Sequence, residues 1–401
     1  MWLDALTLQL GYNATLVALG AMFLGVAAGV TGTFLFLRKR ALVSDAISHA
    51  TLPGVGIAFM LMVALGGDGR SLLGLLLGSA VSAGFGLLCI GWLTRFTRLA
   101  EDAAIGAVLS VFFGFGIVLL TIIQTMTAGR QAGLEGFLLG STAGMLWNDA
   151  MIIVVGGVLT LAVVMALRRP MTLVAFDPEY AAASGLNVAR IDLAIMGLAM
   201  AVTVVGLKIV GLILIVAMLI IPPVTARFWS DRTDKVVWLS GALGGVSAFV
   251  GAALSAAAPS LPTGPIIVLV SFAFFALSLL FAPSRGVLAA FLRHRRFQRR
   301  VHMRQGLLAL AQGQPIYEGF TLRLLRRAGL VEKDGVVTDQ GKARAAKALR
   351  DEKRWELVRA DQALEGAAAL YDGLRALETV LTSDQIEEID RRIGGPKGVG
   401  A

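Results

Sequence analysis

The sequence predicts an all-α polytopic membrane protein with about nine transmembrane helices, followed by a small cytosolic α+β domain. Composition is the first reason: of 401 residues, 56% are hydrophobic and 16% are charged, whereas soluble proteins carry about a quarter charged residues. The second reason is the distribution of charge. Residues 1–284 hold 14 Lys or Arg and 12 Asp or Glu, and residues 285–401 hold 22 and 15.

This charge distribution divides the chain into a transmembrane domain (1–284), a basic juxtamembrane segment (285–304) and a cytosolic extension (305–401). A transmembrane helix needs about 20 mostly apolar residues. Two of the predicted spans, 190–207 and 209–228, could instead be one long helix that is broken around residues 206–208. The predicted spans are 12–36, 46–66, 71–93, 103–125, 149–167, 190–207, 209–228, 237–257 and 263–282.

The basic residues of the loops predict the orientation of these spans. One set of helix ends carries eleven Lys or Arg, and the opposite set carries only Arg70, Arg130 and Lys208. Because cytoplasmic loops are enriched in Lys and Arg, we expect the N-terminus outside and the C-terminal extension in the cytoplasm. An odd number of spans requires the same arrangement.

The segment SDAISHATLPG, residues 44–54, brings an acid and an imidazole into an apolar stretch. Asp45 and His49 are four residues apart, and no other histidine occurs before His294. On a helix these positions share one face, so both side chains can point into a pore. A carboxylate and an imidazole suit Mn²⁺, Zn²⁺ or Fe²⁺ alike, and ionisable groups within spans are functional by default. The pair is a candidate transient metal site.

A structural interpretation of the same segment remains open. Ser44 and Asp45 are good N-cap residues, so Asp45 could cap the second predicted helix and pair with His49. Pro53 removes one backbone hydrogen bond inside that helix and frees a carbonyl. We therefore expect the helix to be distorted next to the candidate site.

Other ionisable groups in the spans are assigned structural roles. Asp192 lies one turn into the sixth predicted span near Arg190, as an interfacial residue, and Glu101 and Asp102 begin the fourth span, where acids favour a helix N-terminus. No GxxxxGK[ST] or HExxH motif occurs. The chain is therefore not expected to be an enzyme, and energy must come from a separate subunit or an ion gradient.

A short helix is predicted in the loop after the fifth span. In FDPEYAAASGL, Asp177 is a typical N-cap, Pro178 suits the first helical position, and Glu179 lies in the first turn. Gly185 is a typical stop. An Ala-rich amphipathic helix that includes Ala182 can dock into a groove on another subunit, or it can be a plain surface helix.

Four stretches, in this order, resemble the permeases of metal-type ABC importers, which move zinc, manganese or iron. They are LRKRALVSDAISHATLPGVGIAF, EDAAIGAVLSVFFGFGIVLL, FDPEYAAASGL and VGLILIVAMLIIPPVTAR, and the resemblance covers about residues 10–285. It implies that residues 179–185 form the coupling helix that contacts the ATPase. It also implies a bacterial inner membrane location.

The resemblance implies three protein partners. They are a second permease chain (identical or paralogous), a cytosolic ABC ATPase dimer and an extracytoplasmic metal-binding protein. The second permease would complete the metal site of Asp45 and His49 across a two-fold axis. No permanently bound cofactor is expected, and the divalent metal is the substrate.

The extension begins with a basic segment, residues 285–304, that suits anionic membrane lipids. A leucine-bearing helix, the strand-turn-strand LVEKDGVVT and a helix from about Asp339 then predict a winged helix. This part resembles the winged-helix domain of metal-dependent iron and manganese repressors. DNA is an unlikely partner because the chain is tethered to a membrane and the extension carries many acids. No His or Cys follows His302, so metal sensing by the extension is not expected.

Together these patterns predict the permease subunit of an ABC importer for a divalent transition metal. Manganese is expected first because of the repressor-like extension, with zinc and iron as alternatives. Two other classes stay open: a proton- or ion-coupled secondary transporter that uses Asp45 and His49, and a membrane-tethered transcription regulator. A secondary transporter often shows inverted repeats, and none is evident in the sequence.

Overall fold

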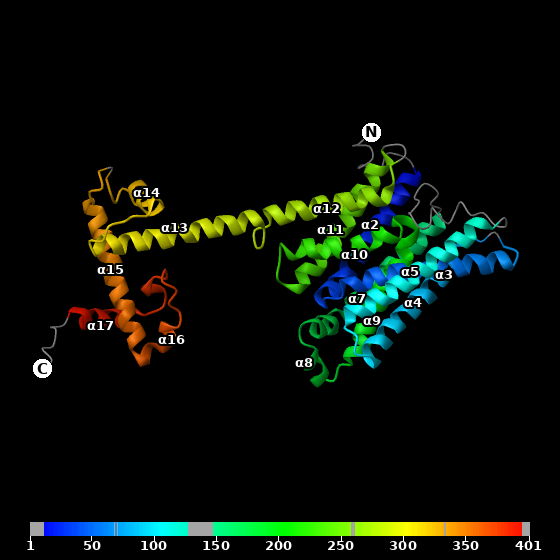
Figure 1. Cartoon of the computed structure of the whole chain (residues 1–401), viewed down its shortest axis with the longest axis horizontal. Coiled ribbons are helices and arrows are strands. Elements are labelled where there is room, and N and C mark those ends of the chain that lie inside the picture. Colours follow the sequence, from blue (N-terminus) through cyan, green and yellow to red (C-terminus); the bar gives the residue numbers. More distant parts are fainter. Residues whose placement is uncertain are drawn as a thin grey trace. The chain divides into compact units, whose positions relative to one another are not determined.

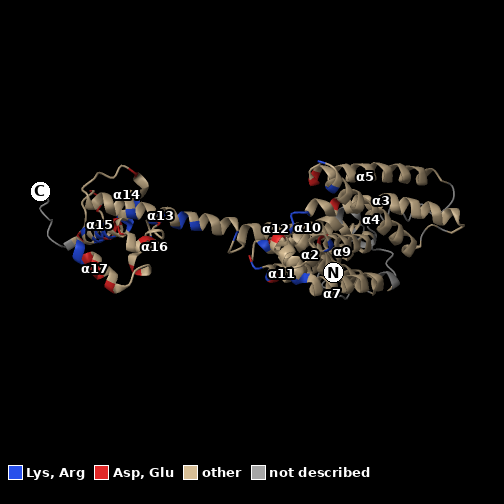
Figure 2. Cartoon of the chain, turned by 90° about the horizontal axis from the view of Figure 1, so that it is seen from below, with Lys and Arg blue, Asp and Glu red and all other residues tan. Residues whose placement is uncertain are grey.

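The computed structural model describes residues 12–67, 69, 71–126, 147–257, 261–332 and 334–394. The chain divides into two compact units, Met1–Ala289 and Ala290–Ala401 (Figure 1). The first unit consists mainly of long apolar helices and the second of more polar helices. Figure 2 shows that charged residues are sparse along the helices of the first unit and frequent in the second.

Eight described helices of the first unit are long and apolar enough to cross a membrane, and α10 (Leu212–Arg227) is a shorter apolar helix. The all-helical, multi-pass membrane class predicted from the sequence is thus confirmed. The eight long helices are α2 (Tyr12–Leu37), α3 (Ala41–Ala64), α4 (Leu72–Phe96), α5 (Glu101–Thr125), α7 (Trp147–Phe176), α9 (Val188–Val210), α11 (Thr233–Ala256) and α12 (Thr263–Phe281).

The predicted spans 190–207 and 209–228 are two separate helices, α9 and α10. Gly211 alone separates them, with a φ of 80° that favours glycine over any other residue. α10 has 16 residues, about 24 Å of helix at 1.5 Å per residue. That is shorter than a hydrocarbon core of about 30 Å, which makes α10 the exception among the apolar helices.

Helix α2 is the core of the transmembrane unit, packed against α7, α9, α10 and α11. Its backbone touches that of α11: a Cβ on Gly25 would lie 2.3 Å from the carbonyl oxygen of Gly244, and one on Gly29 equally close to that of Ser240. The Ser240 hydroxyl donates a 2.6 Å hydrogen bond to the Gly29 carbonyl. Small residues allow this approach, which drives helix association where no hydrophobic effect operates.

Helix α3 is held by similar contacts with α4 and α5. The backbones of α3 and α4 meet at Gly54 and Gly78, where a Cβ on Gly54 would lie 2.1 Å from the Gly78 carbonyl oxygen. On the α5 side, a Cβ on Gly116 would lie 2.5 Å from the Cβ of Leu52. These close approaches fix the helix that carries Asp45 and His49.

In the second unit, every regular element described is helical. α13 (Val287–Ala311) carries the chain from the first unit into the second. The other helices are α14 (Gly319–Arg327), α15 (Asp339–Ala360), the one-turn α16 (Glu365–Ala368) and α17 (Ser383–Gly394), with short 3₁₀ turns at Gln362–Leu364 and Leu377–Thr379.

The predicted α+β winged-helix domain is therefore wrong. LVEKDGVVT does turn at Gly335, with a φ of 93°, but within the described residues it yields only one isolated antiparallel bridge, between Val331 and Val337, and no strand. The physical reason is that the segment after the turn at Gly335 is very short. Thr338 already serves as the N-cap of α15, accepting the Gly341 N–H at 3.1 Å, so the chain turns into a helix before a ladder can form.

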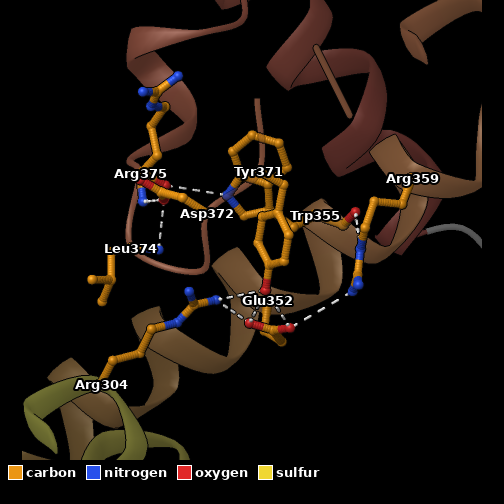
Figure 3. Close-up of polar contacts among 8 residues, drawn as sticks. All are labelled: Arg304, Glu352, Trp355, Arg359, Tyr371, Asp372, Leu374 and Arg375. Atoms are coloured by element: carbon orange, nitrogen blue, oxygen red, sulfur yellow. Dashed lines mark hydrogen bonds and ion pairs between the residues drawn. The ribbon is translucent and has the colours of Figure 1, made fainter. Parts of the chain in front are cut away.

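The second unit is held together by a polar cluster around Glu352 (Figure 3). Its carboxylate accepts hydrogen bonds from Arg304 of α13 and, at 3.1 Å, from the Tyr371 hydroxyl. Trp355, one turn further along α15, is 1% exposed and donates to the Arg375 carbonyl at 3.3 Å. These contacts join α13, α15 and the segment after α16 into one body.

The α2–α11 contact predicts a specific sensitivity to glycine substitution. Gly244→Ala places a Cβ 2.2 Å from the Gly25 carbonyl oxygen, which should cost roughly 1–3 kcal/mol through overpacking. We expect a lower melting temperature of the detergent-solubilised protein in size-exclusion measurements after heating. Gly91→Ala is the control, because a Cβ there meets nothing within 4 Å. Equal stability of the two variants would contradict the described packing.

The ion pair of Arg354 with Asp390 ties α15 to α17, with the Arg354 Nε 2.6 Å from a carboxylate oxygen. The hydrogen bond from Arg354 lowers the pKa of Asp390. A lowered carboxyl pKa gives stability that is present above the ordinary value near 4 and lost as pH falls through the lowered value.

We therefore expect Arg354→Ala to speed hydrogen exchange in α17 at pH 7 by up to about fivefold, the equivalent of roughly 1 kcal/mol for an exposed pair. After correction for intrinsic rates, the difference from wild type should vanish well below pH 4. Lys342→Ala is the control because its partner Asp339 is fully exposed. A difference that persists undiminished at low pH would contradict this assignment.

Candidate functional site

The helix that carries the acid–histidine pair begins earlier than the sequence suggested. α3 starts at Ala41, with Arg40 at the N-cap position and no side-chain capping bond. Asp45 therefore lies inside the helix, more than one turn from its start. Ser44 is buried, and its hydroxyl donates back to the Ala41 carbonyl at 2.6 Å. The N-cap interpretation of Ser44 and Asp45 is wrong, and the carboxylate is left without that structural task.

Asp45 and His49 lie on one face of α3, as their spacing predicts. The His49 Nε2 is 3.4 Å from an Asp45 carboxylate oxygen. The two side chains differ in exposure, 42% for Asp45 and 17% for His49. The carboxylate is thus open on one side, and the imidazole is largely enclosed beneath it.

The imidazole of His49 is positioned by α5. Its ring meets the ring of Phe113 edge to face, with centroids 4.9 Å apart. The His49 Nδ1 is buried and has no hydrogen-bond partner in the described part of the chain. A buried imidazole nitrogen without a partner is uncommon in folded proteins. The imidazole thus faces Asp45 with Nε2, and the exposed side of the Asp45 carboxylate is open to a ligand.

Pro53 lies within α3, and the helix continues past it to Ala64; a distortion of the helix at Pro53 stays a prediction. Proline has no N–H, and the helical bond to the His49 carbonyl is therefore missing. The ring of Pro53 packs against the backbone of α5, where a Cβ on Gly116 would lie 3.3 Å from it. The close packing of α5 supports the helix where its own hydrogen bond is absent.

At this place on α3, the described residues bring two metal-ligating groups together, Asp45 and His49. No group of three or more His, Cys, Asp or Glu side chains with ligand geometry occurs among the described residues. A carboxylate and an imidazole on adjacent turns can bind a divalent cation weakly. Further ligands would have to come from water, from backbone carbonyls or from another chain.

A second ionic group lies at the end of α2 and the start of α3. Arg38 donates to Asp192 of α9 at 2.6 Å and to the Val174 carbonyl of α7 at 3.0 Å. Arg40 lies 3.2 Å from the same Asp192 oxygen and 2.8 Å from Glu101 of α5. Asp192 thus pairs with these two arginines rather than with its sequence neighbour Arg190.

This group was not predicted, because the run of cations at residues 38–40 by itself indicates only the orientation of the spans. The sequence does show basic residues (Arg38, Arg40) and acidic residues (Glu101, Asp192) near the ends of predicted helices, which could have indicated ion pairs between helices. Charges at the same membrane face need partners, but a single sequence does not say which. We call Arg38, Arg40, Glu101 and Asp192 the helix-end ion cluster.

The predicted loop helix is present as α8 (Pro178–Ala183). The Asp177 carboxylate accepts the Tyr180 N–H at 2.9 Å, and Gly185 has a φ of 85°, as the start and stop signals require. Ala181 is buried and anchors the helix, while Glu179 and Ala182 are exposed. α8 therefore presents a short exposed surface, which includes Tyr180, in the loop that joins α7 to α9 (Figure 1).

Comparison with known proteins gives a consistent result. Residues 12–282 match the ABC 3 transport family. The chain is 39% identical to the "Manganese transport system membrane protein MntC" of Bacillus subtilis (77% of this chain, 70% of that one) and 38% identical to the "Zinc transport system membrane protein TroC" of Treponema pallidum (71% and 94%). Its fold resembles that of "PsaBC from Streptococcus pneumoniae in complex with Fab", with a TM-score of 0.61 and 28% identity over 73% of this chain and 98% of that one.

Proposed function

The chain belongs to the ABC 3 transport family and is a permease subunit of a metal importer, and on this premise we propose that it passes a divalent transition metal along α3. Manganese is the first candidate, with zinc and iron after it. The relatives named for manganese and for zinc support the first two of these candidates. The observation that carries the proposal is the pair of Asp45 and His49, 3.4 Å apart on one helix face.

The chemistry of this pair suits an ion in passage. An oxygen and a nitrogen ligand fit Mn²⁺, Zn²⁺ or Fe²⁺, and a partial ligand set allows release, since conduction requires binding that is favourable enough to enter and weak enough to leave. The His49 carbonyl, freed by Pro53, is a further oxygen ligand on the same turn. A second permease chain, identical or paralogous, would supply the remaining ligands.

The energy for transport comes from partner subunits in this proposal. The sequence has no phosphate-binding loop, so ATP binds and is hydrolysed in a cytosolic ATPase dimer. An extracytoplasmic binding protein delivers the metal to the outer mouth. Closure of the ATPase dimer moves α8, and the permease then exposes Asp45 and His49 to the cytoplasm, where the C-terminal extension also lies.

The transport site is tested by uptake. In cells that lack their own importers, Asp45→Asn and His49→Ala should each lower the initial rate of manganese uptake by roughly tenfold or more, since every 1.4 kcal/mol lost from ion binding is a factor of ten. Protein abundance in the membrane must be equal. His294→Ala, an exposed residue of α13, is the control and should transport normally. Unchanged uptake of manganese, zinc and iron in both site variants would remove the proposal.

The role of α8 is tested by association with the ATPase. Asp177→Ala removes the N-cap and should destabilise α8 by about 1 kcal/mol, and Glu179→Arg reverses a charge on its exposed face. Both should reduce the amount of ATPase that co-purifies with the permease from the native membrane. Asp234→Ala changes an acid of α11 that is 76% exposed and should leave association intact. Equal recovery of ATPase in all variants would argue against docking at α8.

A further inference from the structure

The helix-end ion cluster unites five helices of the transmembrane unit through two arginines. Arg38 contacts α9 at Asp192 and α7 at the Val174 carbonyl. Arg40 contacts α9 at Asp192 and α5 at Glu101. Since Arg38 follows α2 and Arg40 is the N-cap residue of α3, the ends of α2, α3, α5, α7 and α9 meet in one set of charges.

The turn that carries the two arginines has an unusual backbone. Three residues join α2 to α3, and the middle one, Lys39, has a φ of 58°. It is the only residue other than glycine with positive φ in the described part of the chain. Such outliers persist only where the surroundings enforce them. Here the strained turn brings Arg38 and Arg40 to the same oxygen of Asp192.

The charges are buried more deeply than helix-end charges usually are. The side chains of Arg38 and Asp192 are 15% and 11% exposed. Both arginines approach the same Asp192 oxygen, Oδ2, while Oδ1 and the Arg38 Nε are buried with no hydrogen bond among the described residues. Because Asp192 Oδ1 and the Arg38 Nε–H are unused, the cluster can form a different ion pair or hydrogen bond when its helices shift.

The position of the cluster gives it a mechanical consequence. Val174 and Asp192 lie on the two helices that flank α8, three residues before its N-cap and four residues after the start of α9. At the other side, Arg40 lies five residues before Asp45 on the same helix. A displacement of α8 would move the ends of α7 and α9 that carry the cluster contacts. A displacement of the cluster would in turn move the start of α3.

We propose that the helix-end ion cluster transmits movement of α8 to α3, with Asp192 and Arg40 as positioning residues that keep ATP hydrolysis coupled to metal movement. This inference rests on the proposed function. The residues touch neither metal nor nucleotide. They act by holding the flanks of α8 and the start of α3 in one rigid set, which can exchange one ion pairing for another.

The test is the ratio of manganese ions moved to ATP hydrolysed, measured for the complete importer in vesicles. Asp192→Asn keeps the shape of the side chain and removes its charge, and Arg40→Gln cuts the tie to α3 while leaving Arg38 paired with Asp192. Both should lower the ratio about tenfold while ATP hydrolysis continues. Arg40→Lys, which retains the charge, should restore part of it. Asp234→Asn, an exposed acid paired with Arg168 at 3.6 Å, should leave the ratio unchanged.

The outcomes separate the two proposals. If the wild-type importer moves no manganese, zinc or iron, the proposed function fails. If the wild type transports and both variants keep the wild-type ratio, the proposed function stands and the coupling role of the cluster is overturned. Should Asp192→Asn fail to fold, Arg40→Gln alone decides, because it leaves the buried pair of Arg38 and Asp192 intact.

Discussion

Direct backbone contact between α2 and α11 fixes the helix around which the rest of the transmembrane unit is arranged. Gly25, Gly29 and Gly244 leave no room for a side chain, and the Ser240 hydroxyl closes the contact with a hydrogen bond. In an apolar environment, close approach of this kind replaces the hydrophobic effect as the source of association. Because α2 also contacts α7 and α9, its placement determines where Arg38 meets those two helices.

The two carboxylates within the apolar helices, Asp192 and Asp45, differ in how they are paired. A buried charge is tolerated where it is paired, and Asp192 meets that condition with two arginines on one oxygen. Within the described residues, Asp45 pairs with the His49 imidazole. Two arginines thus hold one oxygen of the Asp192 carboxylate, and no arginine or lysine side chain holds that of Asp45 in the described part of the chain. This difference, rather than the mere presence of an acid in a span, separates the proposed transport site from the ion cluster.

Local signals predicted the local structure well. Asp177, Pro178 and Gly185 fixed the start and stop of α8, because caps act within a few residues. The wing-like segment of the extension failed because a turn signal says nothing about how many pairs will follow, and Thr338 begins α15 instead. The start of α3 was missed because Arg40 offers no capping side chain. The pairing of Arg38 with Asp192, 154 residues away, has no local signal at all.

The second unit is stabilised by different interactions from the first. One part of its core consists of Trp355, Val358, Leu377, Leu381 and Ile389, and cross-helix ion pairs such as that of Arg354 with Asp390 add polar contacts. In the first unit, glycines allow direct backbone contact between helices. The family match stops at residue 282, where apolar helices give way to α13. The transmembrane unit is thus stabilised by backbone contact between helices. The extension is stabilised separately, by its own ion pairs and buried side chains.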